Sequence, residues 1–154
     1  MLRIKIVAVG NLKEKYFVDA VKEYSKRITP FAKLEICEIQ EANSSISNIE
    51  QIKNVEGQKI LSELDGFVVV LDSGGKQLTS PELAEFLKEK AVSGVSKISF
   101  VIGGSVGLSD EVKTRANYVL SFSKMTFPHQ LMRVVLLEQL YRAETILNNI
   151  RYHK

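Results

Sequence analysis

The sequence predicts an α/β fold, with a mostly parallel sheet sandwiched by helices, in a single domain over residues 1–154. Strand-like and helix-like segments alternate along the chain with short breaks and no linker, which is typical of βαβ units. Two apolar runs, Phe67–Asp72 and Ile98–Ile102, indicate central parallel strands that are buried on both faces. A chain of 154 residues can bury about two-thirds of its unfolded surface around one core.

The N-terminal part predicts two strands joined by a helix. Met1–Gly10 is an apolar run interrupted by single charges, which indicates the first strand. The following helix ends before Pro30. It is predicted from apolar residues at helical spacing: Phe17, Val21, Tyr24 and Ile28. Lys33–Ile39 is then predicted to be the second strand.

A second helix is predicted after a polar connection. Glu41–Ile46 is mostly polar, and we expect a mobile loop there. Ser47–Glu50 has the spacing of a capping box, which opens a helix that extends to Leu64. The apolar strand that follows ends at Asp72–Lys76, where two glycines predict a turn.

The next segments continue the alternation of helix and strand. Ser80 is predicted to be an N-cap, followed by Pro81 in the first turn of a helix. The strand Ile98–Ile102 is broken at Gly103–Gly104. Ser109 then begins a short helix whose first turn is acidic, which suits the positive end of the helix dipole.

The last helix is apolar on nearly all sides. It begins at His129, after the short strand-like segment Tyr118–Phe122 and a loop. At about 100° per residue, its apolar side chains leave no wide polar face: Leu131, Met132, Val134, Val135, Leu136, Leu137, Leu140, Tyr141, Ala143, Ile146 and Leu147. A helix of this kind is buried on all sides. Since the sheet covers one side, we expect a second copy of the chain to cover another, which predicts a homodimer.

The composition excludes several classes of site. Cys37 is the only cysteine, so an intramolecular disulfide and a cysteine-rich metal site are excluded. The two histidines have no paired carboxylates at ligand spacing, and we predict no metal site. A net charge of +3 is compatible with an anionic partner but is lower than most dedicated nucleic-acid domains carry.

Nothing in the sequence directs the chain to a membrane. No apolar run approaches the roughly 20 residues that a membrane span requires. The charges at Arg3 and Lys5 make the first strand a poor signal peptide. We therefore expect a cytoplasmic protein.

The segment Gly103–Gly107 follows a buried strand and precedes a helix. It is either a close backbone approach to a bound nucleotide or nucleoside, or only a tight turn, and the pattern alone leaves both open. No Lys-Ser or Lys-Thr pair follows, so it is not a Walker loop. A dinucleotide fingerprint is also excluded, because the first strand-to-helix turn, Gly10–Lys13, has one glycine.

Two pairs of side chains on the last helix are candidates for a site. His129 and Arg133 are one turn apart, about 40° around the axis, and could reach the same cleft. The alternative for His129 is a residue at the helix start that touches solvent. Glu138 and Arg142 have i, i+4 spacing, which predicts an ion pair on the helix surface. On so apolar a helix, this pair could instead organise a subunit interface or a substrate pocket.

The C-terminal segment Arg151–Lys154 combines two cations, an imidazole and an aromatic ring. Such a combination suits an unpaired base with its phosphates. The alternative is a frayed polar terminus. No Ser-His-Asp arrangement and no catalytic cysteine support hydrolase chemistry.

Several segments together carry a resemblance to a known family. The more general ones are Ile6–Gly10, Val70–Asp72, Gly75–Lys76, Val101–Gly104 and Gly107–Leu108. The more specific ones are Leu120–His129, Arg133–Val134, Glu138–Gln139, Tyr141–Ala143 and Tyr152–Lys154. On these segments the chain resembles, over its whole length, the RlmH family of SPOUT-class RNA methyltransferases. It departs from the family pattern at Ser105–Val106 and at Ile150–Arg151, where a proline is expected before the tyrosine.

The resemblance implies a parallel α/β fold whose C-terminal part is threaded into a deep trefoil knot. It also implies S-adenosylmethionine as the methyl donor and a homodimer. The implied cofactor contacts are Leu71, Gly103, Phe122, Ser123, Lys124, Met125, Thr126 and Phe127. The implied substrate is N3 of a pseudouridine in helix 69 of 23S rRNA, within the assembled ribosome.

For this reaction we expect five residues near the target base: His129, Arg133, Arg142, Tyr152 and His153. Arg133 or Arg142 would favour the anion that forms when N3 loses its proton, and Tyr152 would stack on or orient the base. Neutral His153 or His129 is the candidate general base, with no choice between them. Two alternatives remain: a SPOUT methyltransferase that acts on another RNA such as tRNA, and a non-catalytic α/β module that binds a nucleoside or RNA.

Overall fold

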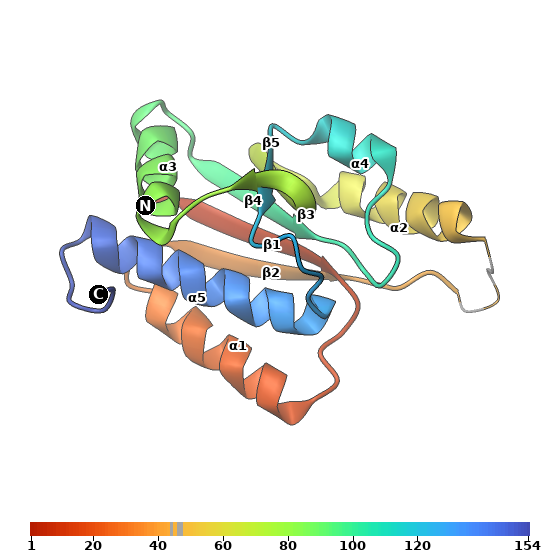
Figure 1. The fold of residues 1–154 in the computed structure, drawn as a ribbon, viewed down its shortest axis with the longest axis horizontal. Coiled ribbons are helices and arrows are strands. Elements are labelled where there is room, and N and C mark those ends of the chain that lie inside the picture. The colour runs from red at the N-terminus through yellow and green to blue at the C-terminus, as the bar shows by residue number, and fades with distance from the viewer. Residues whose placement is uncertain (44, 46–47) are drawn as a thin grey trace.

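Parallel strands form the centre of the computed structural model, which describes residues 1–43, 45 and 48–154. Within these residues, five strands form one sheet in the order β2-β1-β4-β3-β5, and each neighbouring pair is parallel (Figure 1). The strands are β1 (Arg3–Val9), β2 (Lys33–Ile39), β3 (Phe67–Gln77), β4 (Lys97–Ile102) and β5 (Tyr118–Ser121). The helices are α1 (Lys15–Ile28), α2 (Ile49–Glu63), α3 (Ser80–Val92), α4 (Asp110–Arg115) and α5 (His129–Leu147). The predicted fold class is confirmed.

Side chains that alternate along the strands give each face of the sheet its own core. Val69 faces the core that the sheet shares with α1, α3 and α5. Its neighbours Val68 and Val70 face the core shared with α2 and α4. Because helices cover both faces, the strand needs apolar residues on both sides, as its continuous apolar run predicts. Among the described helices, none is long and apolar enough to cross a membrane.

The end of β3 differs from the prediction. The turn expected over Asp72–Lys76 is wrong, because β3 continues through this segment as a strand with a bulge between Leu71 and Lys76. Leu120 of β5 pairs with β3 twice, once on each side of an irregularity in the register, so β3 bulges around the end of β5. A Cβ on Gly75 would lie 2.6 Å from the carbonyl oxygen of Val119. The glycine therefore permits a close approach of two strands instead of a reversal of the chain.

The start of α3 lies one residue before the predicted N-cap. Thr79, not Ser80, caps this helix, and its side chain accepts a hydrogen bond from the Glu82 amide at 3.2 Å. The Glu82 carboxylate in turn accepts one from the Thr79 amide at 2.8 Å, which completes a capping box. Ser80 is left free to donate to the side chain of Gln139 on α5 at 2.6 Å.

The start of α2 is capped by Asn48, whose side chain accepts a hydrogen bond from the Gln51 amide at 3.2 Å. Ser47, which the sequence predicts to open a capping box, lies outside the described residues. The predicted mobile loop over Glu41–Ile46 also includes two residues outside them. The described part of the chain agrees with a helix that begins at residue 49.

The apolar helix α5 is buried mainly by elements of its own chain. It lies on the sheet and packs against α1 and α3 (Figure 1). Its inward side chains are fully buried: Leu136, Leu137, Leu140 and Ala143. Two neighbouring helices thus cover sides that the sheet leaves open, and they account for much of the apolar pattern without a second copy. Near the helix start, Leu131 remains 36% exposed. The homodimer stays a prediction.

Candidate functional site

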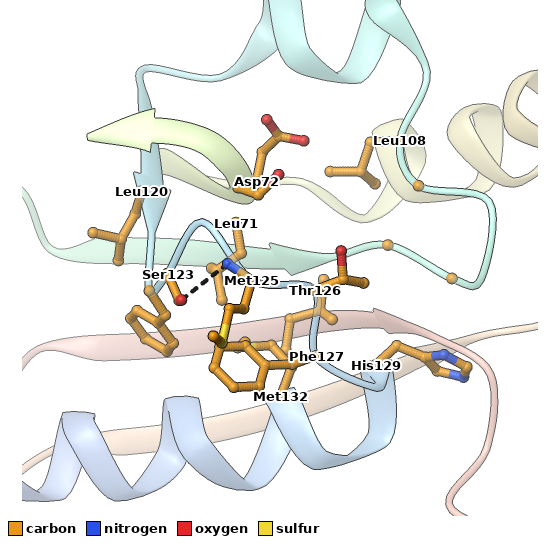
Figure 2. A pocket seen from close by; sticks show the side chains of 16 residues that line it. Leu71, Asp72, Leu108, Leu120, Ser123, Met125, Thr126, Phe127, His129 and Met132 are labelled. Carbon is orange, nitrogen blue, oxygen red and sulfur yellow. Dashed lines mark hydrogen bonds between the residues drawn. The ribbon is translucent and has the colours of Figure 1, made fainter. Parts of the chain in front are cut away.

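A pocket opens at the carboxyl edge of the sheet, where β4 and β5 end and β3 bulges (Figure 2). Ligands of open α/β sheets bind at this edge. The walls come from the bulged middle of β3, beyond its pairing with β4, and from the turn after β4, the loop after β5 and the first turn of α5. The lining residues are Leu71, Asp72, Ser73, Ile102, Gly103, Gly104, Gly107, Leu108, Leu120, Phe122, Ser123, Met125, Thr126, Phe127, His129 and Met132.

Segments far apart in the sequence bring most of the expected cofactor contacts to this pocket. Those that line it are Leu71, Gly103, Phe122, Ser123, Met125, Thr126 and Phe127. Lys124 is exposed and does not line it. The role of these residues in binding stays a prediction.

The glycine turn after β4 is tight, and it also forms a wall of the pocket. The Gly107 amide donates to the Gly104 carbonyl at 3.1 Å, and Gly107 has a φ of +84°. A Cβ on Gly103 would lie 3.0 Å from Leu108 and 3.1 Å from the backbone of Gly107. The interpretation as a tight turn is confirmed, whereas a close approach to a bound nucleotide or nucleoside stays a prediction for a turn that lines the pocket.

The loop after β5 is held by serine side chains. The hydroxyl of Ser121 lies within hydrogen-bonding distance of two carbonyl oxygens, that of Ser73 at 3.1 Å and that of Ser123 at 3.0 Å. The hydroxyl of Ser123 accepts a hydrogen bond from the Met125 amide at 3.0 Å, which Figure 2 shows as a dashed line. These bonds tie the end of β5 to β3 and fix the start of the loop, whose Met125 is exposed and lines the pocket.

Asp72 is a lining residue that the sequence reasoning missed. It is the one carboxylate among the lining residues, and it accepts a hydrogen bond from the Gly74 amide at 3.0 Å. Lys113 of α4 lies 3.7 Å from its other oxygen. The position of Asp72 after an apolar strand was the signal that could have identified it, but the following glycines led to its interpretation as part of a turn.

His129 and Arg133 do not share a cleft, so that prediction is wrong. His129 lines the pocket and lies at its rim beside Thr126 (Figure 2). Arg133 is buried, with 1% of its surface exposed, and it faces the ends of β1 and β2. Its guanidinium donates to the Glu38 carboxylate at 2.6 Å and to the Gly10 carbonyl at 3.0 Å. Because these partners hold it inside the chain, Arg133 is not available to a base in the pocket.

The C-terminal residues fold back onto α5. Arg142 and Glu138 form the predicted i, i+4 ion pair at 2.6 Å, and Tyr152 donates to the same carboxylate oxygen at 3.1 Å. His153 lies 3.2 Å from the guanidinium of Arg142. The ring of Tyr152 packs edge-on against that of Tyr141, with 4.8 Å between centroids. These contacts give the terminal residues a defined position instead of a frayed one.

The electrostatic environment of this C-terminal cluster follows from its contacts. The hydrogen bonds to Glu138 raise the pKa of Arg142 above its ordinary value. Burial, together with the nearby Glu138 carboxylate, raises the pKa of the Tyr152 hydroxyl. Tyr152 is therefore a neutral donor at physiological pH, and Arg142 a permanent cation.

The pocket and the C-terminal cluster are separated along α5. Arg142 lies more than three helical turns after His129, which is roughly 20 Å at 1.5 Å per residue. In one chain, Arg142, Tyr152 and His153 therefore do not reach the pocket that His129 lines. The five residues expected near one base fall into three places: the pocket, the buried ion pair and the C-terminal cluster.

Comparison with known proteins gives matches over nearly the whole chain. A family model described as "Predicted SPOUT methyltransferase" matches residues 2–153. Two relatives are named Ribosomal RNA large subunit methyltransferase H, one from Carboxydothermus hydrogenoformans and one from Clostridium beijerinckii. They are 46% and 50% identical over 159 aligned positions, which cover 99% of this chain and 100% of each relative.

Solved structures with low sequence identity share the fold. A methylase family protein from Neisseria gonorrhoeae is 12% identical with a TM-score of 0.51, over 99% of this chain and 95% of that one. A probable methylase family protein from Haemophilus influenzae Rd KW20 is 16% identical with a TM-score of 0.50. That match covers 95% of this chain and 66% of the other protein.

Proposed function

This chain belongs to the SPOUT methyltransferase family, and we propose that it transfers a methyl group from S-adenosylmethionine to large-subunit ribosomal RNA. The names of two relatives that match it over almost their full length support this substrate. We further propose N3 of a pseudouridine in helix 69 of 23S rRNA as the target, within the assembled ribosome. The observation that carries the proposal is the pocket at the carboxyl edge of the sheet, built from segments that the family resemblance assigns to the cofactor.

The fold is the α/β knot fold of this family, with the knot in its C-terminal part. β3 bulges around the end of β5, and the hydroxyl of Ser121, the last residue of β5, donates to the carbonyl oxygen of Ser73 on β3. This path brings three loops together at one edge of the sheet. The fold therefore supplies backbone groups on several sides of the pocket.

The pocket residues fit S-adenosylmethionine. Leu71, Leu108, Phe122 and Phe127 offer apolar walls for an adenine ring. Gly103 lines the pocket without a side chain, and Leu108 closes the space that a Cβ would need, so a ligand in the pocket would meet the backbone at this position. The carboxylate of Asp72 would attract the cationic groups of the cofactor. When bound, the cofactor supplies a methyl group on a positively charged sulfur.

In methyl transfer, the residues of the protein align the two reactants and accept the proton that leaves the target nitrogen. When bound, S-adenosylmethionine would supply its methyl carbon to N3 and keep the electron pair of the carbon–sulfur bond, so the residues of the protein would have to hold the two reactants in line. The N3 proton has to leave for the nitrogen to attack. His129 is the imidazole that lines the pocket, and we propose that it receives this proton or passes it to solvent. Arg133 has no part in this step, because it is buried in its ion pair.

The C-terminal cluster requires a partner to act at the pocket. Since Arg142, Tyr152 and His153 lie roughly 20 Å along α5 from His129, we propose a homodimer in which the cluster of one chain approaches the pocket of the other. Light scattering tests this assembly. It should give twice the mass of one 17.3 kDa chain at micromolar concentration, and a monomer would overturn the proposal.

Methyl transfer to intact ribosomes, free 23S rRNA and tRNA tests the function as a whole. We expect labelled methyl groups to be incorporated into intact ribosomes, much more slowly into free 23S rRNA, and not into tRNA. Calorimetry with S-adenosylmethionine separates the alternatives. Transfer to tRNA alone would identify a different RNA substrate, whereas no cofactor binding and no transfer would indicate a non-catalytic binding module.

A further inference from the structure

The carboxylate of Glu138 is the centre of the C-terminal cluster. One oxygen accepts two hydrogen bonds from Arg142, at 2.9 Å and 2.6 Å, and a third from the Tyr152 hydroxyl at 3.1 Å. The other oxygen accepts from the side chain of Gln139 at 2.9 Å. The Glu138 side chain is only 17% exposed. A charged pair in this setting holds its geometry better than a free surface pair does.

Arg142 connects the Glu138 carboxylate to the C-terminal residues. Its Nη1 lies 3.2 Å from Nδ1 of His153, and its guanidinium lies 4.8 Å from the centre of the Tyr152 ring. Tyr152 is therefore held between Arg142 and the ring of Tyr141. The His153 side chain is fixed at one nitrogen and exposed elsewhere.

The contact with Arg142 determines which ring nitrogen of His153 bears the proton. A guanidinium has five N–H donors and no acceptor. The Nδ1 atom that faces it must therefore be the acceptor, so in the neutral ring the proton is on Nε2. A proton on Nδ1 would place one N–H group against another. The exposed nitrogen is consequently a hydrogen-bond donor.

We propose that Glu138 and Arg142 are positioning residues that hold His153 as its Nε2–H tautomer, so that the ring offers the RNA a hydrogen-bond donor and not a base. This inference rests on the proposed function. A uracil-type base carries a carbonyl on each side of N3, and charge moves onto these oxygens as N3 loses its proton. A fixed N–H directed at one of them stabilises that charge. Proton acceptance is then left to His129, the imidazole at the pocket.

The tautomer can be read by nitrogen NMR on the full-length protein. The chain has two histidines, so a His129→Gln variant leaves only the signals of His153. At a pH where the ring is neutral, we expect a protonated Nε2 and an unprotonated Nδ1. An Arg142→Gln variant should give a mixture of tautomers. Asp19→Asn, which breaks the exposed i, i+4 pair with Lys15 on α1, is the matched control and should change nothing. A protonated Nδ1 in the parent protein would overturn the inference.

The same inference predicts an order of activities at position 153. Glutamine keeps an N–H donor near the place of Nε2 but cannot accept the N3 proton as a base. We expect His153→Ala to lower methyl transfer by about 10²-fold, as the loss of one positioned donor does. His153→Gln should retain most of the activity. Equal inactivity of the two variants would contradict the donor role and indicate a base.

Glu138→Gln tests the positioning step. It removes the charge that holds Arg142 and Tyr152 while it keeps the size of the side chain. We expect methyl transfer to fall about 10-fold or more with S-adenosylmethionine affinity unchanged, and the His153 signals to report mixed tautomers. Unchanged activity and tautomer would overturn the role of Glu138. If the parent protein methylates no ribosomal RNA, the proposed function fails, whereas the NMR result decides the tautomer independently.

Discussion

The guanidinium of Arg133 and the carboxylate of Glu38 lie 2.6 Å apart although 95 residues separate them in the sequence. Arg133 is buried, and a second nitrogen of its guanidinium donates to the carbonyl of Gly10. The ion pair therefore fastens the first turns of α5 to the ends of β1 and β2. His129 lies one turn earlier on the same helix, so this pair also fixes one wall of the pocket.

Loss of Glu38 should destabilise the protein, because it leaves a buried cation without its partner. We expect Glu38→Gln to lower the free energy of unfolding by about 3 kcal/mol. Adding Arg133→Met, which replaces the cation by an apolar side chain, should restore most of this loss. Urea unfolding of the two single variants and the double variant measures both effects. Additive losses in the double variant would show that the pair is not coupled.

Replacement of Glu144 should stabilise the protein, in contrast to the loss of Glu38. Burial on α5 raises the pKa of this carboxyl above its ordinary value. The folded state therefore binds the proton more tightly than the unfolded state, so Glu144 lowers stability as the pH rises through its folded pKa. We expect Glu144→Gln to raise the urea midpoint at neutral pH and to have no effect in acid, where both side chains are neutral. A lower midpoint at neutral pH would show that the carboxylate has a stabilising partner.

A side chain at Gly103 should block the cofactor. In Gly103→Val the Cβ lies 3.0 Å from Leu108, so the new methyl groups or the displaced Leu108 occupy the pocket. Because the pocket is then occupied by protein atoms, we expect S-adenosylmethionine affinity to fall at least ~100-fold, which is about 2.8 kcal/mol of binding free energy. Calorimetry measures the affinity, and a cooperative unfolding transition confirms the fold. Normal binding by this variant would place the cofactor elsewhere.

The strands and helices follow from local sequence patterns. The features that the sequence did not predict depend on contacts between residues far apart in the chain. The bounds of α5 and the short helix after Ser109 follow from residues within one or two turns. The burial of Arg133 depends on Glu38, far away in the chain, and no local pattern indicates it. In the same way, Gly75 looked like a turn residue because its contact with Val119 forms only in the sheet.

In the candidate site, too, local patterns predict some residues, whereas others depend on tertiary contacts. The glycine turn and the loop Phe122–Phe127 could be placed at a pocket because they follow strands, and strands of a parallel sheet end at one edge. Lys124 was included with its neighbours, although it is exposed and lies off the pocket. The position of Tyr152 against Glu138 could not be predicted, since it requires the tail to reverse onto α5.

Removal of the last three residues should separate RNA recognition from cofactor binding. In its own chain the cluster lies roughly 20 Å along α5 from His129, and in the proposed homodimer it approaches the partner's pocket to contact the RNA, so a chain that ends at Arg151 should bind S-adenosylmethionine within a few-fold of normal affinity. Methyl transfer should fall by at least ~10². The remaining ionic contacts with RNA should weaken as salt rises. Full activity of the truncated protein would return the tail to a structural role, and an equal loss of cofactor binding would mean that the tail closes the pocket.

The most direct test of the proposed function is the site of methylation on ribosomes from cells that lack this protein. Purified protein and labelled S-adenosylmethionine are added, and the modified nucleoside is located by digestion and mass spectrometry of the rRNA. We expect one methyl group per large subunit, on N3 of a pseudouridine in helix 69, and none when the Gly103→Val protein is used. Methyl transfer to another RNA, or no transfer by a protein that binds the cofactor, would contradict the account.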